Sequence, residues 1–163
     1  MESKKKDFVY AQNDYLNSYI QFADTKSAVF ITVNGVLIGF LYAQFKKLLP
    51  LNLLESKQIV LSFSIILLLI SYIFLFFVIF PRRKYRNGNS IVFWEDVSKH
   101  KDVSSYKLIV SSIKGDEFEE IMVEQNYYLS KTASQKYKHL HFSFIFSIAS
   151  YFVLIIFCIL TLL

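Results

Sequence analysis

The sequence predicts an all-α integral membrane protein with three transmembrane helices, helical cytoplasmic extensions and a small cytoplasmic domain. Long apolar runs recur at Ser27–Phe45, Ile59–Phe80 and Phe142–Leu163, and the middle run carries no charged residue. Each run is near the roughly 20 apolar residues that a helix needs to cross a bilayer. The chain has only 163 residues, of which 54% are hydrophobic. A soluble protein of this size could hardly bury three such helices at once.

The distribution of basic residues predicts the orientation of the spans. Lys and Arg number four in residues 1–26, three in 46–58 and eleven in 81–141. Because basic residues accumulate on the cytoplasmic side, the N-terminus and the segment 81–141 are expected in the cytoplasm. The predicted domains are a cytoplasmic N-terminal helix (1–26), a transmembrane hairpin (27–80, with spans 27–45 and 59–80), a cytoplasmic sensing region (81–141) and a third transmembrane helix (142–163).

The first helical element is expected to begin well before the first span. Phe8, Tyr15, Tyr19 and Phe22 recur near helical spacing, and no Gly or Pro interrupts the chain before Gly35. We expect one long helix that runs into the span. The alternative is an amphipathic helix on the membrane surface.

The segment after the second span contains helix breakers and capping residues. Pro81 ends the span, and the following IVFWEDV fits either a strand or a helix. Asp102 or Ser104 is expected to cap a short helix, and Gly115 to mark a turn. Asp116, with Glu119 three residues later, resembles a capping box and is expected to start a helix that continues into the third span.

No pattern of residues predicts catalysis, a metal site or a cofactor. The sequence has neither a Gly-rich phosphate loop nor a Walker-type Lys. The acidic cluster from Glu117 to Glu124 is better explained as a solvated helix face. With one Cys, a disulfide framework is excluded. Because no catalytic motif is present, the chain is not expected to be an enzyme.

Polar and small residues within the first and third spans indicate either helix packing or a pore. Asn34 is costly against lipid and is expected to face protein or water. Ser143, Ser147 and Ser150 form a stripe that Cys158 and Thr161 extend. Small residues allow close helix packing, and the same stripe could line a wet path. The residues proposed for packing or a pore are Thr32, Asn34, Gly35, Gly39, Ser143, Ser147 and Ser150.

Basic and aromatic residues of the sensing region could bind an anionic ligand. Arg offers bidentate geometry for phosphate, and aromatic rings can stack on a base. The alternative for the cluster after the second span is topology determination and attraction to anionic lipid. The candidate nucleotide-binding residues are Arg82, Arg83, Arg86, Trp94, Lys99, Lys101, Tyr106, Lys136 and Tyr137.

Four stretches, in order, resemble the Pycsar effector membrane proteins. The first, NDYLNSYIQFADTKSAVFITVNGVLIGFL, leads into the first span; the second span then ends in PRR. NSIVFWEDVSKHKDVSSYKLIV and QNYYLSKTASQKYKHLHFSF follow, so that the resemblance covers nearly the whole chain. FWED departs from the family, in which a small Gly often precedes the acid.

The resemblance implies an effector of bacterial anti-phage defence in the inner membrane. In this family a partner enzyme makes a nucleotide signal, and the effector impairs the membrane so that growth stops. For this chain we expect the ligand to be a cyclic mononucleotide or a short oligonucleotide. We expect a homo-oligomer, such as a tetramer, that opens an ion-permeable path. Asp24 and Lys26, at the expected mouth of the first span, are hypothesised to couple ligand state to span movement. The alternatives are a non-conducting anchor that recruits a cytosolic enzyme and a toxin gated by lipid or voltage.

Overall fold

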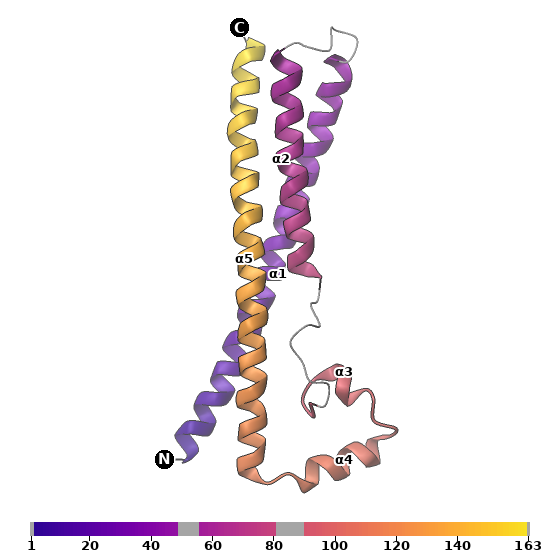
Figure 1. The fold of residues 1–163 in the computed structure, drawn as a ribbon, viewed down its shortest axis with the longest axis vertical. Coiled ribbons are helices and arrows are strands. Elements are labelled where there is room, and N and C mark those ends of the chain that lie inside the picture. The colour runs from indigo at the N-terminus through magenta and orange to yellow at the C-terminus, as the bar shows by residue number, and fades with distance from the viewer. Residues whose placement is uncertain (1, 49–55, 81–89, 163) are drawn as a thin grey trace. The chain divides into compact units, whose positions relative to one another are not determined.

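A computed structural model describes residues 2–48, 56–80 and 90–162, and in these residues every regular element is a helix. Figure 1 shows their arrangement. The five helices are α1 (Glu2–Leu48), α2 (Ser56–Ile79), α3 (Trp94–Val97), α4 (Val103–Ser112) and α5 (Gly115–Leu162). Helices α1, α2 and α5 are long and apolar enough to cross a membrane, which confirms the three predicted hydrophobic helices.

The chain divides into two compact units, which are described separately. The span unit comprises residues 22–81 and 135–163 and therefore holds α2 with the later parts of α1 and α5. The polar unit comprises residues 1–21 and 82–134, with α3, α4 and the earlier parts of α1 and α5.

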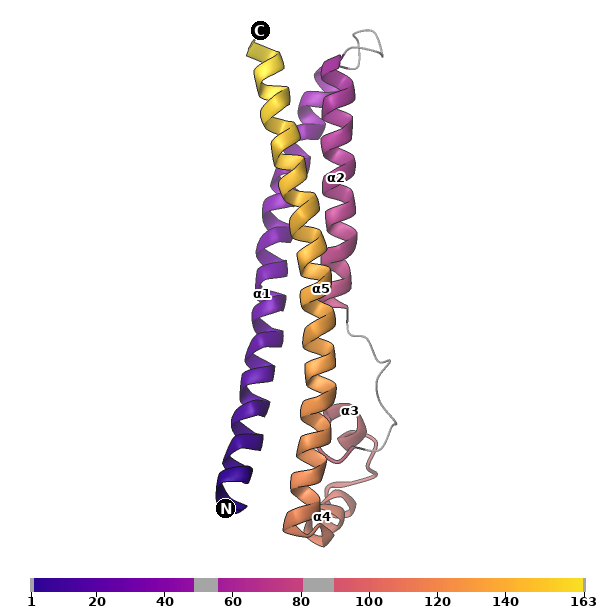
Figure 2. The same cartoon turned by 60° about the vertical axis from the view of Figure 1, so that its left-hand side comes forward.

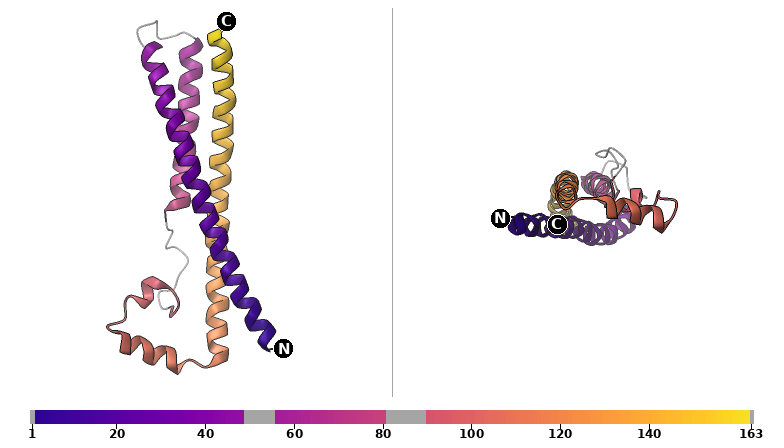
Figure 3. Two further views of the ribbon diagram at one scale, coloured as in Figure 1. Left: turned by 180° about the vertical axis from the view of Figure 1, so that it is seen from behind. Right: turned by 90° about the horizontal axis from the view of Figure 1, so that it is seen from below.

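The span unit is a three-helix bundle. Figures 1 and 2 show α2 beside the later parts of both α1 and α5, and the view from behind in Figure 3 agrees. One apolar cluster contains Ala23, Leu75, Val78 and Leu140. A second cluster contains Leu41, Leu61, Leu68 and Phe157. Each cluster takes residues from all three helices, so apolar packing holds the bundle together in two places.

The polar unit pairs the early parts of α1 and α5 through a polar network. The side-chain amide of Asn126 is buried; it donates to the Val9 carbonyl over 2.9 Å and accepts from Asn13 Nδ2 over 2.8 Å. Lys5 lies 3.7 Å from Glu119, and the rings of Tyr10 and Phe118 are 6.5 Å apart. A buried Asn between paired helices fixes their register because a slip would leave its amide unsatisfied.

The short elements of the polar unit follow their capping chemistry. Asp102 is the N-cap of α4: its side chain accepts from the Ser105 amide, and Ser105 Oγ accepts from the Asp102 amide. One of the two predicted caps is thereby confirmed. The IVFWEDV patch forms the single turn α3, so helix rather than strand is correct there.

The predicted start of the third long helix was wrong. Gly115 is the first residue of α5 rather than a turn, and Asp116 lies inside the first turn. The Phe118 amide donates to the Lys114 carbonyl over 3.1 Å, which places the cap at Lys114. Asp116 and Glu117 still stabilise this end, because acidic groups near a helix N-terminus interact favourably with the helix dipole.

The two glycines of the first span have different surroundings. A Cβ added to Gly35 would lie 2.7 Å from the Tyr72 hydroxyl, whereas one added to Gly39 would meet nothing within 4 Å. The Tyr72 hydroxyl donates to the Ile31 carbonyl, which holds this hydroxyl close to Gly35. The predicted close contact between helices therefore involves Gly35, and within the protomer it does not involve Gly39.

We expect Gly35→Ala to destabilise the bundle and Gly39→Ala to leave it unchanged or slightly more stable. The Gly35 methyl would displace the Tyr72 hydroxyl from its acceptor, and overpacking of this kind costs about 1–3 kcal/mol. Ala is the better helix former at a site with open space. Thermal unfolding in detergent measures both variants, and equal melting temperatures for the two would contradict this reading.

Candidate functional site

A cluster of hydrogen-bonded polar side chains lies inside the span unit. Asn34 of α1 is fully buried, and its side-chain amide donates to Ser71 Oγ over 3.2 Å and to Ser147 Oγ over 2.9 Å. The amide oxygen accepts from the Tyr151 hydroxyl over 2.7 Å. One side chain thus joins all three helices of the bundle.

Serine pairs continue this cluster along α2 and α5. Ser71 Oγ lies 2.8 Å from Ser147 Oγ, 3.1 Å from Ser143 Oγ and 3.0 Å from the Ser143 carbonyl. Ser64 Oγ lies 2.7 Å from Ser150 Oγ, which also donates to the Ser64 carbonyl over 3.0 Å. All these serines are fully buried. We call the following set the polar seam: Asn34, Ser64, Ser71, Ser143, Ser147 and Ser150.

Sequence spacing explains how the polar seam forms. Ser64 and Ser71 are seven residues apart in α2, as are Ser143 and Ser150 in α5. Residues seven apart return to nearly the same face of a helix. Small side chains allow the helices to approach closely, and their hydroxyls then bond across the contact. A seam of this kind holds helices together, and it is also polar enough to hold water if the helices separate.

Three of the residues predicted for a pore or for helix packing do not belong to the polar seam. Thr32 is exposed, and its hydroxyl donates to the Ala28 carbonyl of its own helix over 3.0 Å. Gly35 packs under Tyr72, and Gly39 is exposed. The expected extension of the serine stripe was also wrong, since Cys158 and Thr161 are both exposed.

The charged residues at the start of the first span are paired across helices. Asp24 Oδ1 forms an ion pair with Lys136 Nζ of α5. Lys26 lies elsewhere, with its ammonium 4.2 Å from the centre of the Phe22 ring. The ion pair at this end of the span is therefore interhelical, and it joins Asp24 to Lys136, which sequence analysis had placed with the candidate nucleotide-binding residues.

Ser27 lies between this ion pair and the polar seam along α1. Its hydroxyl is fully buried, and no described residue forms a hydrogen bond with it. Ser27 is seven residues before Asn34, so both occupy the same face of α1. A buried polar atom without a protein partner is commonly satisfied by an internal water.

Several candidate nucleotide-binding residues lie in the polar unit. Lys99 Nζ bonds to the buried Asp96 carboxylate over 2.7 Å. The Tyr106 hydroxyl donates to the Ile91 carbonyl over 2.9 Å, and its ring lies 5.2 Å from that of His100. Lys101 is exposed. These contacts gather Lys99, His100 and Tyr106 around the turn between α3 and α4.

The remaining candidates belong to the span unit or have no described side chain. Lys136 and Tyr137 belong to the span unit, where Tyr137 packs against the cluster of Ala23, Leu75, Val78 and Leu140. Trp94 begins α3, but its side chain is outside the described part of the chain. Arg82, Arg83 and Arg86 also lie outside the described residues.

Sequence analysis missed the contribution of α2 to the seam and the two tyrosines beside it. Ser62, Ser64 and Ser71 interrupt the apolar run, and the seven-residue spacing of the last two was the available signal. Tyr72 and Tyr151 had no signal of their own, because tyrosine is common near membrane interfaces and their acceptors, the Ile31 carbonyl and Asn34, are distant in sequence.

Fold and site together define, in the described residues, a helical protein in which three helices long and apolar enough to cross a membrane enclose a polar seam. A family model described as the Pycsar effector protein domain matches residues 8–163. The chain is also 30% identical over 151 residues to Pycsar effector protein SaPycTM of Staphylococcus aureus, covering 91% of this chain and 90% of that protein. The chain therefore belongs to the Pycsar effector family, whose members act in anti-phage defence. No solved structure is significantly similar to it.

Proposed function

We propose that this effector responds to a nucleotide signal made by a partner enzyme and opens an ion-permeable path in the bacterial inner membrane. Membrane impairment would then stop the growth of the infected cell. The polar seam is the observation that carries this proposal, because it places hydroxyl and amide groups from three helices inside an apolar bundle. Helices that separate along this seam would offer those groups to water.

The energy of the seam suits a switch. A hydrogen bond between membrane helices contributes on average about 0.6 kcal/mol, because the separated helices also find polar partners. The few interhelical bonds of the seam therefore oppose opening by only a few kcal/mol. A ligand that binds one of two helix arrangements more tightly by about 5.5 kcal/mol moves a population from 1:99 to 99:1.

We assign the coupling role to the Asp24–Lys136 pair. It joins α1 to α5 at the start of the spans, and both helices also extend into the polar unit. Ser27, with its buried hydroxyl, lies along α1 between this pair and Asn34. Water that enters at the ion pair would thus reach the buried Ser27 hydroxyl and then the polar groups of the seam.

Reception of the nucleotide is assigned to the segment 81–141, which we place in the cytoplasm together with the N-terminus. Lys99, Lys101 and Tyr106 supply cations and a ring there, as a phosphate-bearing base requires. Trp94 and the arginines after the second span would contribute to the same site. The chain would act without catalysing a reaction, and several copies would surround the path.

A non-conducting membrane anchor that recruits a cytosolic enzyme is the second candidate. The hydrogen bonding of the seam favours it, because Asn34, Ser71 and Ser147 satisfy one another within a single protomer. Such a seam needs no water to be stable and suits a permanent structural bundle equally well.

Ion flux through liposomes that contain the purified protein distinguishes the two candidates. We expect one member of a panel of cyclic and linear nucleotides to change the flux at least tenfold. Liposomes with Asn34→Leu protein, inserted in equal amount, serve as the matched control because this variant removes the centre of the seam. Absence of flux from inserted, oligomeric protein under every nucleotide would instead support the anchor.

A further inference from the structure

The inner face of α1 is occupied by the protomer's own helices. Val9, Leu16 and Ala23 are buried at intervals of seven residues, as are Ser27, Asn34 and Leu41. Such heptad spacing follows the seam between helices that wind around each other. Any further partner of α1 must therefore dock on a different face of the helix.

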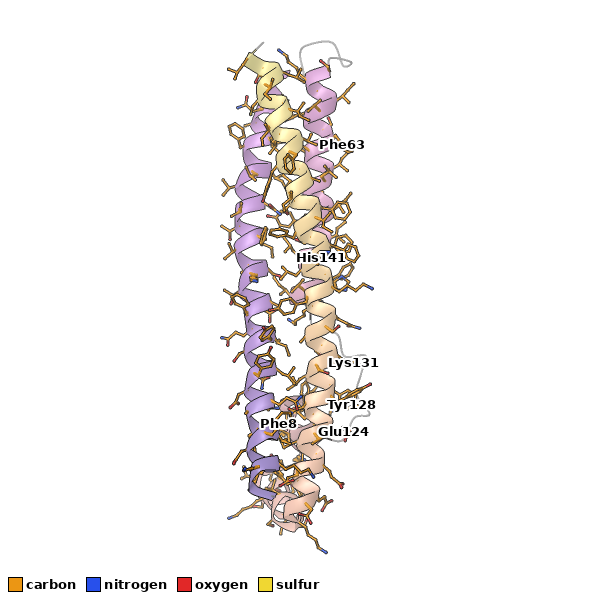
Figure 4. All side chains as sticks on the ribbon, turned by 90° about the vertical axis from the view of Figure 1, so that its left-hand side faces the viewer. Phe8, Phe63, Glu124, Tyr128, Lys131 and His141 are labelled. Carbon is orange, nitrogen blue, oxygen red and sulfur yellow. The ribbon has the colours of Figure 1, made fainter. Side chains whose placement is uncertain are left out.

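A column of large apolar residues lies on a second, exposed face of α1. Its members are spaced seven residues apart in the sequence, and each is between 53% and 70% exposed. Figure 4 labels the first of them, Phe8, on α1. The large column consists of Phe8, Tyr15, Phe22, Val29 and Val36.

A column of small residues runs beside the large column. Each small residue follows a large one by three positions, and all five are exposed. Residues three apart are neighbours on a helix surface, so a gap accompanies each large side chain. The small column consists of Ala11, Ser18, Thr25, Thr32 and Gly39.

Gly39 indicates that the small column contacts a helix outside the protomer. Glycine within a helix is less favourable than alanine by about 1 kcal/mol. A Cβ at position 39 would meet nothing within 4 Å, so nothing in the described protomer requires glycine there. Close approach of another helix would explain both its small size and the order of the column.

Neither lipid alone nor a soluble partner alone can cover the full length of the two columns. Helix α1 has 47 residues, more than twice the roughly 20 needed to cross the bilayer. The early part contains Lys4, Lys5, Lys6 and Asp7, which belong in water, yet Phe8 and Tyr15 are exposed there. Val29 and Val36 lie in the apolar part, which a soluble protein cannot reach. A single partner that covers the whole face must therefore pass from water into the membrane.

We propose that this face of α1 docks the same face of α1 from a second copy of the chain, in parallel. Copies inserted with one topology are related by rotation about the membrane normal, so their α1 helices run in the same direction. Across a two-fold axis, the large column of each copy packs into the small column of the other. Seven-residue spacing keeps the two faces in contact along a left-handed supercoil. The interface goes beyond the proposed function, because it can form whether or not a path opens.

Cysteine cross-linking tests this register. Cys158 is exposed and is first replaced by Ser in all variants to remove its background. Ser18→Cys then places a thiol in the small column, and Asn17→Cys places one on the neighbouring exposed face, about 100° away around the helix. A disulfide needs Cα atoms within roughly 7 Å. In native membranes treated with copper phenanthroline, we expect Ser18→Cys to give cross-linked dimer at least tenfold faster than Asn17→Cys. Equal rates would overturn the proposal.

A substitution that fills the gap provides a second, independent test. Gly39→Leu adds a side chain into space that is open within the protomer, so we expect the helix content of the variant to be unchanged. Its native mass in mild detergent should fall from an oligomer to a monomer, or to half the subunit number if other interfaces exist, and Gly39→Ala should weaken the assembly less than Gly39→Leu does. An unchanged mass for Gly39→Leu, or a monomeric parent protein, would overturn the proposal. Nucleotide-dependent flux from a monomeric parent would reject the interface and the path formed by several copies, but would leave the nucleotide-gated opening of a path standing.

Discussion

Asp24→Ala is expected to weaken the span unit and abolish toxicity while leaving the protein inserted in the membrane. The Lys136 side chain is only 13% exposed, whereas that of Asp24 is 42% exposed. Removing the carboxylate leaves a nearly buried ammonium without its counter-charge, which costs about 1–3 kcal/mol or more. Thermal unfolding in detergent measures the stability, and membrane fractionation after expression measures insertion.

The reciprocal variant, Lys136→Met, is expected to lose less stability than Asp24→Ala. Lys136→Met leaves a carboxylate that water can still reach, so its loss of stability should be clearly smaller than that of Asp24→Ala. The exchange of charges in Asp24→Lys with Lys136→Asp should recover part of the lost stability, because the pair can form again. Equal losses for the two single variants would mean that burial of Lys136 does not govern the effect. Retained toxicity of Asp24→Ala would remove the coupling role.

Asn34→Leu is expected to destabilise the bundle more than any exposed substitution in the first span. The variant removes donors to Ser71 and Ser147 and the acceptor of the Tyr151 hydroxyl. Three interhelical bonds at an average of about 0.6 kcal/mol, together with a Tyr151 hydroxyl left without its acceptor, give a loss of about 2–4 kcal/mol. Thermal unfolding of purified protein in detergent checks this value.

Thr32→Val is the matched control for the seam. Thr32 is two residues away, is similarly polar and lies in the same span, but it is exposed and bonds only to its own backbone. Thr32 belongs to the small column, but Val has nearly the same shape and volume, so its replacement should keep that column intact and change stability by no more than about 0.5 kcal/mol, as surface substitutions usually do. If Thr32→Val and Asn34→Leu lowered the melting temperature equally, the seam would not hold the bundle together.

Hydropathy was sufficient to predict the three long helices, because a bilayer demands continuous apolar length and internally satisfied backbone groups. The extent of the first helix also followed, since nothing between Asp7 and Gly35 breaks a helix. The cap at Asp102 was predictable for a similar reason: capping depends on residues only three positions apart. The capping pattern predicted the wrong helix start at Asp116. The helix begins at Gly115, so Asp116 lies in its first turn among several acidic residues.

The site was only partly predictable, because its contacts join residues far apart in the sequence. Asn34 and the serines of α5 were recognisable as costly or small groups inside apolar runs. Their partners in α2 depended on which face of that helix meets the others. Lys136 shared its basic character with many neighbours, and nothing in the sequence distinguished it as the partner of Asp24, which lies 112 positions earlier.

The sequence by itself determined the class of the protein, because burial in lipid acts on each helix separately through length and polarity. It also determined the capping of α4 and the family, which rest on local patterns and matched stretches of residues. Only the tertiary structure decided that Asn34 bonds to Ser71 and Ser147, that Asp24 pairs with Lys136, and that Thr32 and Gly39 face outward. These outcomes depend on how the helices are rotated against one another, and that rotation is set by the packing of all three helices together.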